Sequence, residues 1–170
     1  MRITSVASRG TQVGLIVLTL AYPLTHFLFH YIPNPFVPSA SIALNMIFPI
    51  LAGYFYGPVS GAMAGAVGTA ISGFASGDVF DALAIFPHAT MGFAAGMLGA
   101  ARAQTGAALT VGIGHVLNLL FYWRFGLLTV DNLGTLALGI VAETTVGVVA
   151  VILVIVLLQS RLYQEPDRRW

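Results

Sequence analysis

Residues 47–74 read IFPILAGYFYGPVSGAMAGAVGTAISGF, and this stretch decides the fold. It joins two apolar runs through the letters YGP, a turn sequence that interrupts helices. The second run is dominated by small residues, and each Gly in a water-exposed helix costs about 1 kcal/mol relative to Ala. In a bilayer, small residues instead let helix backbones approach closely, as the spacing of Gly57, Gly61 and Gly65 allows. The stretch therefore predicts a transmembrane helical hairpin whose small-residue arm packs at the centre of a bundle.

The composition is that of an integral membrane protein. Of 170 residues, 58% are hydrophobic and 8% are charged, and the mean hydropathy is +0.90. Soluble domains carry about 25% charged residues, so this chain has too little polar surface to cover a globule in water. The absence of cysteine excludes disulfides and thiolate metal sites. No basic cluster suits a nucleic acid, so we expect no nucleic-acid partner.

We expect a single all-α domain of six transmembrane helices, because each span needs roughly 20 apolar residues. The apolar runs that we interpret as helices lie at about residues 12–31, 39–56, 58–74, 82–101, 105–125 and 133–159. An even number of spans places both termini on one side of the membrane.

The arginines predict which side that is, because cytoplasmic loops retain positive charge. With the termini inside, Arg124 alone falls outside. The arginines that then fall inside are Arg2, Arg9, Arg102, Arg161, Arg168 and Arg169. We therefore expect cytoplasmic termini, in a multi-pass protein of a prokaryotic cell membrane.

Few strongly polar residues fall within the predicted spans, and such residues usually face the bundle interior or a watery cavity. On the fifth helix, His115, Asn118 and Tyr122 follow the spacing i, i+3, i+7 and share one face, with Trp123 at its outer mouth. On the first helix, Tyr22 and His26 begin a second polar stripe that continues to His30. The simplest arrangement that hydrates these groups is a cavity open to the outside and closed below.

Each polar residue also has a purely structural interpretation. Tyr22 and Trp123 could be interfacial belt residues, and the ring of His88 could satisfy a carbonyl freed by the kink at Pro87. Asn45 and Asn118 could be interhelical hydrogen-bond partners. A carboxyl group at mid-membrane depth, as predicted for Glu143, must be protonated, paired with a neighbour such as His115, or bound to a ligand. The candidate substrate-binding residues are Asn45, Asp81, His88, His115, Asn118, Tyr122, Trp123 and Glu143.

Two stretches, FPILAGYFYGPVSGAMAGAVGTAISGF and IFPHATMGFAAGMLGA, resemble the substrate-binding subunits, or S components, of energy-coupling-factor (ECF) vitamin transporters. In that family an aromatic-Gly-Pro turn ends the second helix, a Gly/Ala-rich third helix follows, and an aromatic-Phe-Pro element opens a fourth helix rich in small residues. The matches cover roughly residues 39–101.

The resemblance implies capture of a substrate from outside, in a pocket lidded by the loops at residues 32–38 and 75–81. The subunit would pass its ligand to a transmembrane coupling protein driven by two cytoplasmic ATPases. No nucleotide site is expected, and no G-x-x-x-x-G-K-[ST] loop occurs. The family's Ala-x-x-x-Ala docking signature is missing from the first helix, where Gly10 and Gly14 give an equivalent spacing and are the candidate coupling contacts. Cobalt and nickel subunits carry His directly after Met, whereas Arg2 stands there in this chain, so no metal is expected.

The leading hypothesis is therefore an uptake subunit without catalytic residues or cofactors, surrounded by membrane lipid. It would bind a small, partly aromatic, polar molecule such as a pyrimidine or thiazole precursor of thiamine, stacked on Tyr122 or Trp123. One alternative is a metal or haem protein that uses the histidines, since imidazole suits Zn, Cu and Fe. Another is a structural subunit without a ligand. An intramembrane hydrolase is disfavoured, because neither G-x-S-x-G nor H-E-x-x-H occurs.

Overall fold

The computed structural model describes residues 9–29, 32–37, 41–128 and 133–163, and it confirms an all-helical architecture for them. A 3₁₀ turn at Leu44–Met46 leads into the second helix. The helices are α1 (Arg9–Phe29), α2 (Ile47–Tyr56), α3 (Pro58–Ser76), α4 (Val79–Ala100), α5 (Gln104–Arg124) and α6 (Leu133–Tyr163).

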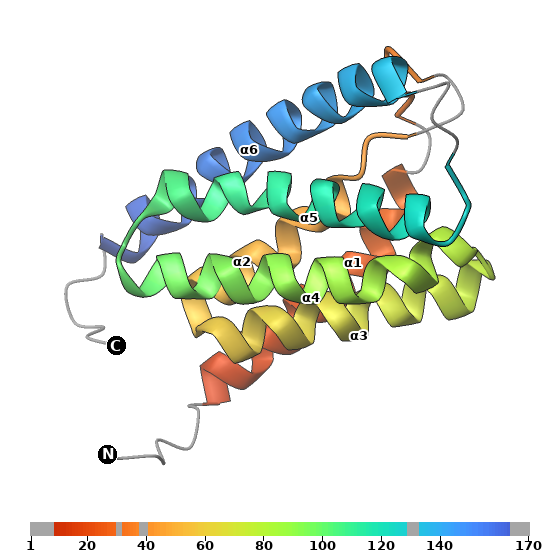
Figure 1. The fold of residues 1–170 in the computed structure, drawn as a ribbon. Coiled ribbons are helices and arrows are strands. Elements are labelled where there is room, and N and C mark those ends of the chain that lie inside the picture. The colour runs from red at the N-terminus through yellow and green to blue at the C-terminus, as the bar shows by residue number, and fades with distance from the viewer. Residues whose placement is uncertain (1–8, 30–31, 38–40, 129–132, 164–170) are drawn as a thin grey trace.

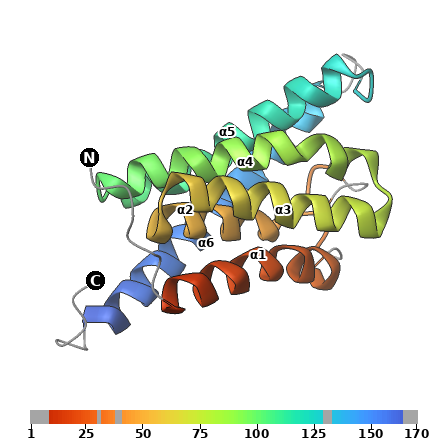
Figure 2. The ribbon, with the colours of Figure 1, turned by 90° about the horizontal axis from the view of Figure 1, so that it is seen from below.

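The helices run up and down a single bundle, so that its two ends can be named by their turns (Figure 1). The "Gly57 end" holds the α2–α3 turn at Gly57, the α4–α5 turn at residues 101–103, the start of α1 and the end of α6. The "Gly77 end" holds the α3–α4 turn and the end of α5. Helices α1 and α5 lie on opposite sides of the α3–α4 pair (Figure 2).

The outer surface of the bundle suits a membrane. Five helices are long and apolar enough to span a bilayer, whereas the helical segment at residues 44–56 is shorter. Large apolar side chains are exposed along α1 and α6, including Val17, Leu24, Val141 and Leu153. The chain thus has the helices of a multi-pass membrane protein.

The second helix is shorter than the predicted range of residues 39–56. Residues 41–43 are not helical, and residues 38–40 lie outside the described residues. The backbone N–H of Ile42 donates to the carbonyl of Ile32 at 2.9 Å, and Ser41 forms an isolated bridge with Pro33. The N–H of Ala43 donates to a carboxylate oxygen of Glu143 at 2.8 Å. These N–H groups are bonded outside a helical ladder, which explains the late helix start.

The predicted polar loop at residues 75–81 is instead a tight turn of two residues. Helix α3 continues to Ser76, and Gly77 adopts the left-handed φ of 70° that ends it. Asp78 then caps α4, because its side chain accepts a hydrogen bond from the N–H of Phe80 at 2.8 Å. The expectation that residues 75–81 form an extended loop that acts as a lid is therefore wrong.

Glycines bring the backbones of α3 and α4 into contact, as the Gly/Ala-rich run of the sequence predicts. A Cβ added to Gly61 would overlap the carbonyl oxygen of Gly92, and one on Gly65 would overlap the backbone of His88. Gly57 differs, since its φ of 95° and the open space around it make it a turn residue.

The interior is divided into an apolar half and a polar half. The buried apolar core, which includes Ile50, Met91, Val111 and Ile155, occupies the half of the bundle nearer the Gly57 end. The buried polar side chains of the helices lie mainly in the half nearer the Gly77 end, which we call the polar half. Its main members are the buried side chains of Tyr22, Asn45, Thr69, Ser72, His88, His115 and Asn118, together with the partly buried side chains of Glu143 and Thr144.

The backbone contact predicts a strong effect of one methyl group. Gly61→Ala would force α3 and α4 apart, and overpacking of this kind costs about 1–3 kcal/mol. We expect a matching fall in the free energy of unfolding, measured by SDS titration in mixed micelles. Gly134→Ala is the matched control, because a Cβ at Gly134 meets nothing within 4 Å. Equal stability of the two variants would contradict this packing.

Candidate functional site

His88 is the centre of the polar half. Its side chain is buried, and its Nδ1 lies 2.7 Å from the hydroxyl of Tyr22 and 2.9 Å from Oγ1 of Thr69. Its Nε2 lies 3.3 Å from the amide nitrogen of Asn118. One imidazole therefore joins α1, α3, α4 and α5. Such a buried network requires satisfied partners, because an unpaired polar group in a dry interior costs about 1–3 kcal/mol.

These contacts decide between the interpretations of three residues. Tyr22 is fully buried and bonded to His88, so the interpretation as an interfacial belt residue is wrong. The His88 ring bonds to side chains of three other helices, which removes the need for a carbonyl freed at Pro87. Asn118 is an interhelical partner, and it also leaves its own oxygen unpaired.

A second group lies closer to the Gly77 end, around His26. Its Nε2 is 3.4 Å from a carboxylate oxygen of Asp81, and its Nδ1 is 3.5 Å from the amide nitrogen of Asn45. Ser76 also donates to the Asp81 carboxylate, at 3.0 Å. This group links α1 and the beginning of α4 to the 3₁₀ turn that precedes α2. His30, which would extend the stripe, lies outside the described residues.

The third group pairs α5 with α6. His115 Nδ1 lies 2.7 Å from the hydroxyl of Thr144, and its Nε2 lies 3.5 Å from Oε1 of Glu143. The same carboxylate oxygen accepts the N–H of Ala43. Glu143 thus lies beside His115, in agreement with the interpretation that it is paired with this neighbour. Its hydrogen bond from Ala43 also attaches the connection between α1 and α2 to α6.

Among the described residues, four buried polar atoms in this half have no hydrogen-bond partner: Asn45 Oδ1, Ser72 Oγ, His115 Nε2 and Asn118 Oδ1. All four residues are at most 7% exposed, and they come from the 3₁₀ turn, α3 and α5. Buried polar atoms in native proteins are nearly always paired with protein groups or ordered water. Their concentration in one half of the bundle marks the place where a polar molecule would complete the network.

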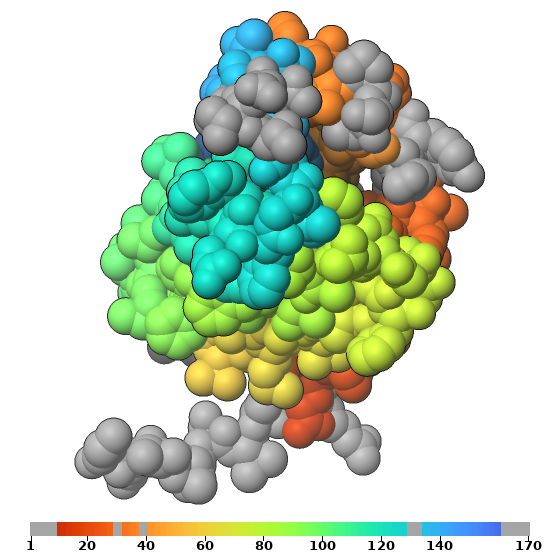
Figure 3. Space-filling view, turned by 45° about the vertical axis from the view of Figure 1, so that its right-hand side comes forward, coloured from red at the N-terminus to blue at the C-terminus, as the bar shows by residue number. Residues whose placement is uncertain are grey.

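The described residues of the connection between α1 and α2, 32–37 and 41–43, are bonded to α6 beside the polar half. The buried side chain of Asn34 donates to the carbonyl of Gly139 in α6 at 2.9 Å, and its Oδ1 accepts the N–H groups of Phe36 and Val37. In the space-filling view, orange residues of this connection lie against the blue beginning of α6 (Figure 3). The connection is therefore attached to α6 at two points, Gly139 and Glu143.

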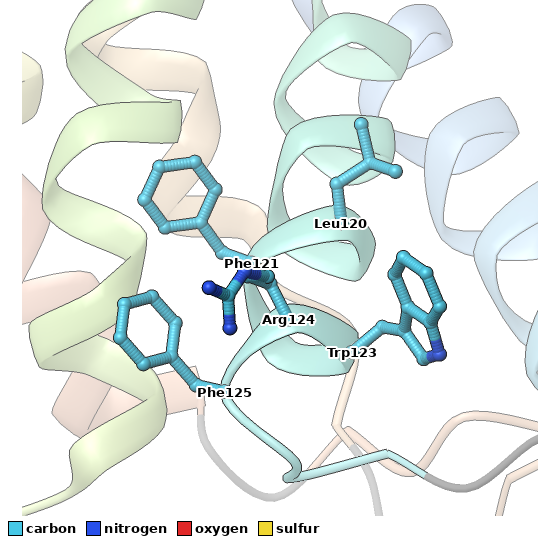
Figure 4. Close-up of a pocket in the computed structure, with 5 residues that line it drawn as sticks. All are labelled: Leu120, Phe121, Trp123, Arg124 and Phe125. Atoms are coloured by element: carbon cyan, nitrogen blue, oxygen red, sulfur yellow. The ribbon is translucent and has the colours of Figure 1, made fainter.

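Two predicted aromatic residues stand apart from the network. Tyr122 donates to the carbonyl of Phe80 at 3.2 Å, and its ring meets the edge of the Phe80 ring with centroids 4.9 Å apart. Trp123 is 58% exposed. It borders a surface hollow of about 290 Å³ at the end of α5 (Figure 4). Its other lining residues are Leu120, Phe121, Arg124 and Phe125, so the hollow is a feature of the outer surface.

Gly14, a predicted contact for a coupling protein, packs instead against another helix of the same chain. A Cβ there would overlap the hydroxyl of Tyr56 in α2. Gly10 is exposed at the beginning of α1. The small residue at Gly14 is therefore explained by packing inside the bundle.

The sequence did not single out Thr69, Ser72, Thr144 or Asn34. Thr69 and Ser72 are spaced i, i+3 within the Gly/Ala run, which places them on one helix face and could have revealed them. Thr144 and Asn34 carry no comparable signal, because their partners lie far away in the sequence. No group of three His, Asp or Glu residues that could hold a metal ion occurs in the described part of the chain.

Comparison with models of known protein families, with curated proteins and with solved structures found no match for this chain.

The His88 network predicts unequal effects of two threonine substitutions. Thr69→Val removes the hydroxyl group that is hydrogen-bonded to the buried imidazole of His88. We expect this substitution to lower the free energy of unfolding by about 1–2 kcal/mol. Thr90→Val, on α4, removes a hydroxyl that donates only to Phe86 of its own helix. That control should stay within about 0.5 kcal/mol of the wild type. SDS titration in mixed micelles measures both, and an equal effect would contradict the role of Thr69.

Proposed function

We propose that this chain is the substrate-binding subunit of an ECF-type transporter, which captures a small vitamin-like or vitamin-precursor-like molecule for uptake. The observation that carries this proposal is the set of four unpaired, buried polar atoms in one half of the bundle. A small molecule with several hydrogen-bonding groups would satisfy them together. The resemblance of residues 39–101 to S components is the reason for proposing an ECF-type transporter in particular.

The division of the interior supports uptake from one side. In this proposal the polar half receives the substrate, and the apolar core around Ile50, Val111 and Ile155 closes the path toward the Gly57 end. Arg102 lies in the α4–α5 turn at the Gly57 end. The start of α1, which carries Arg9, and the end of α6, which carries Arg161, lie at the same end of the bundle. The positive-inside rule would therefore place this end in the cytoplasm of a prokaryotic cell and the Gly77 end outside.

The connection between α1 and α2 would act as the lid. It lies beside the polar half and is held by hydrogen bonds from Asn34 to Gly139 and from Ala43 to Glu143. Breaking these two bonds would free residues 32–37 and 41–43 from α6 and open the polar half toward the Gly77 end. The two-residue turn at Gly77 is too short to add a second lid.

Transport would require further subunits, because this chain holds no nucleotide-binding loop. We propose a transmembrane coupling protein and two ATPase subunits as partners. Gly10 and the exposed apolar face of α1, which includes Val13 and Val17, are the part of the first helix free to meet them. Gly14 would contribute only indirectly, through its contact with Tyr56.

The test of the proposal is native mass spectrometry of the purified chain, released gently from detergent. We expect a co-purified small molecule on the wild type, and its loss from Asn118→Ala and Glu143→Gln, which alter the polar half. Thr145→Val should retain the molecule, because Thr145 is exposed and its hydroxyl donates to Val141 of its own helix.

Two results would contradict the proposal. A wild-type chain that carries no molecule and gains none after incubation with a vitamin mixture would favour a structural subunit. A bound metal or haem would favour the histidine-based alternative.

A further inference from the structure

Among the described residues, the ionisable side chains that contact the polar network are carboxylates and histidines. Glu143 and Asp81 lie beside the rings of His115 and His26. The basic residues of the chain are all arginines. The two arginine side chains that the structure describes, Arg102 and Arg124, are exposed at helix ends. Within the described part of the chain, no guanidinium therefore reaches the unpaired polar atoms.

The Asp81 carboxylate determines which atom Asn45 presents. An ionised carboxylate only accepts hydrogen bonds, so the neutral His26 ring carries its proton on Nε2, which faces Asp81. The Nδ1 of His26 is then an acceptor, and the amide nitrogen of Asn45 donates to it. The atom left unpaired on Asn45 is its carbonyl oxygen, which is an acceptor.

The same reasoning applies to His115. Its Nε2 faces Glu143 and carries the proton, while Nδ1 accepts the hydroxyl proton of Thr144. The 3.5 Å separation between Nε2 and Oε1 leaves this N–H without a hydrogen bond, and Oε1 already accepts from Ala43. The Glu143 carboxylate keeps acceptor capacity on its other oxygen.

The unpaired groups are thus rich in acceptors. The carbonyl oxygens of Asn45 and Asn118 and the free capacity of Glu143 accept hydrogen bonds, Ser72 can do either, and His115 donates. A ligand with several N–H donors would satisfy most of them. A carboxylate or phosphate would face Glu143 across a low-dielectric interior, and no arginine among the described residues lies there to neutralise it.

We propose, resting on the function proposed above, that the polar half selects an uncharged or positively charged molecule with several N–H donors, such as an amidine, an amine or an amino-substituted heterocycle. It discriminates against carboxylates and phosphates. Glu143 supplies the charge selectivity, and the oxygens of Asn45 and Asn118 supply the neutral acceptors.

Three probes of nearly equal size test the charge preference. Benzamidine, benzamide and benzoate differ in net charge and in the number of N–H donors, and each is titrated calorimetrically into the full chain in lipid nanodiscs. We expect benzamidine to bind at least about tenfold more tightly than benzoate, with benzamide in between, because charge-assisted hydrogen bonds are the stronger ones. Glu143→Gln keeps the shape and removes the charge. This variant should lose the preference for benzamidine over benzamide, and Thr145→Val should keep it.

The outcomes separate this inference from the function on which it rests. If benzoate binds as tightly as benzamidine, the charge selectivity is wrong, but a small-molecule site remains. A preference for benzamidine that Glu143→Gln leaves intact removes Glu143 as its source and overturns the inference. If none of the three probes binds, the inference is overturned, whereas the proposed function is still decided by native mass spectrometry of the wild-type chain.

Discussion

The backbone contact between α3 and α4 is the constraint on which the rest of the structure depends. Gly61 and Gly92 face each other so closely that a Cβ on either would overlap the other's carbonyl oxygen. Small residues provide such contacts in membranes, where helices gain nothing from hiding apolar surface from water. Because the two backbones touch, Thr69 on α3 reaches the imidazole of His88 on α4. The same ring then collects Tyr22 from α1 and Asn118 from α5, so one close approach organises four helices.

The division of the interior gives this arrangement its functional meaning. A bundle needed only for stability could be apolar throughout, since buried polar groups bring a desolvation cost. Here the apolar core fills the half near the Gly57 end, while the half near the Gly77 end contains three histidines and keeps four polar atoms unpaired. The connection between α1 and α2 is bonded to α6 beside this half through Asn34 and Ala43. Buried polar groups with unmet hydrogen-bonding capacity are what a binding subunit requires, and they support the proposed function.

The sequence predicted the features that depend on composition and on helical period. The apolar runs predicted the helices, the Gly/Ala run predicted the central contact, and the i, i+3 spacing of His115 and Asn118 placed both inside. It could not predict contacts between distant residues. The hydrogen bond from Ala43 to Glu143 shortens the second helix, and Gly14, for which its spacing predicts contact with a coupling protein, packs on Tyr56 instead. Trp123 has the chemistry of a stacking residue, but its position one residue after Tyr122 turns it toward the outer surface.

The central claim is that the polar half opens toward the outside while the apolar half stays closed, and cysteine accessibility tests it most directly. The chain has no cysteine, so Ser72→Cys and the control Ala95→Cys each add a single thiol to an otherwise thiol-free protein. Both positions are fully buried, the first in the polar half and the second in the apolar core. In intact cells, a small, positively charged methanethiosulfonate reagent should modify Ser72→Cys from outside and leave Ala95→Cys unmodified. Equal modification of the two thiols, or modification of Ser72→Cys only from the cytoplasmic side, would contradict the account.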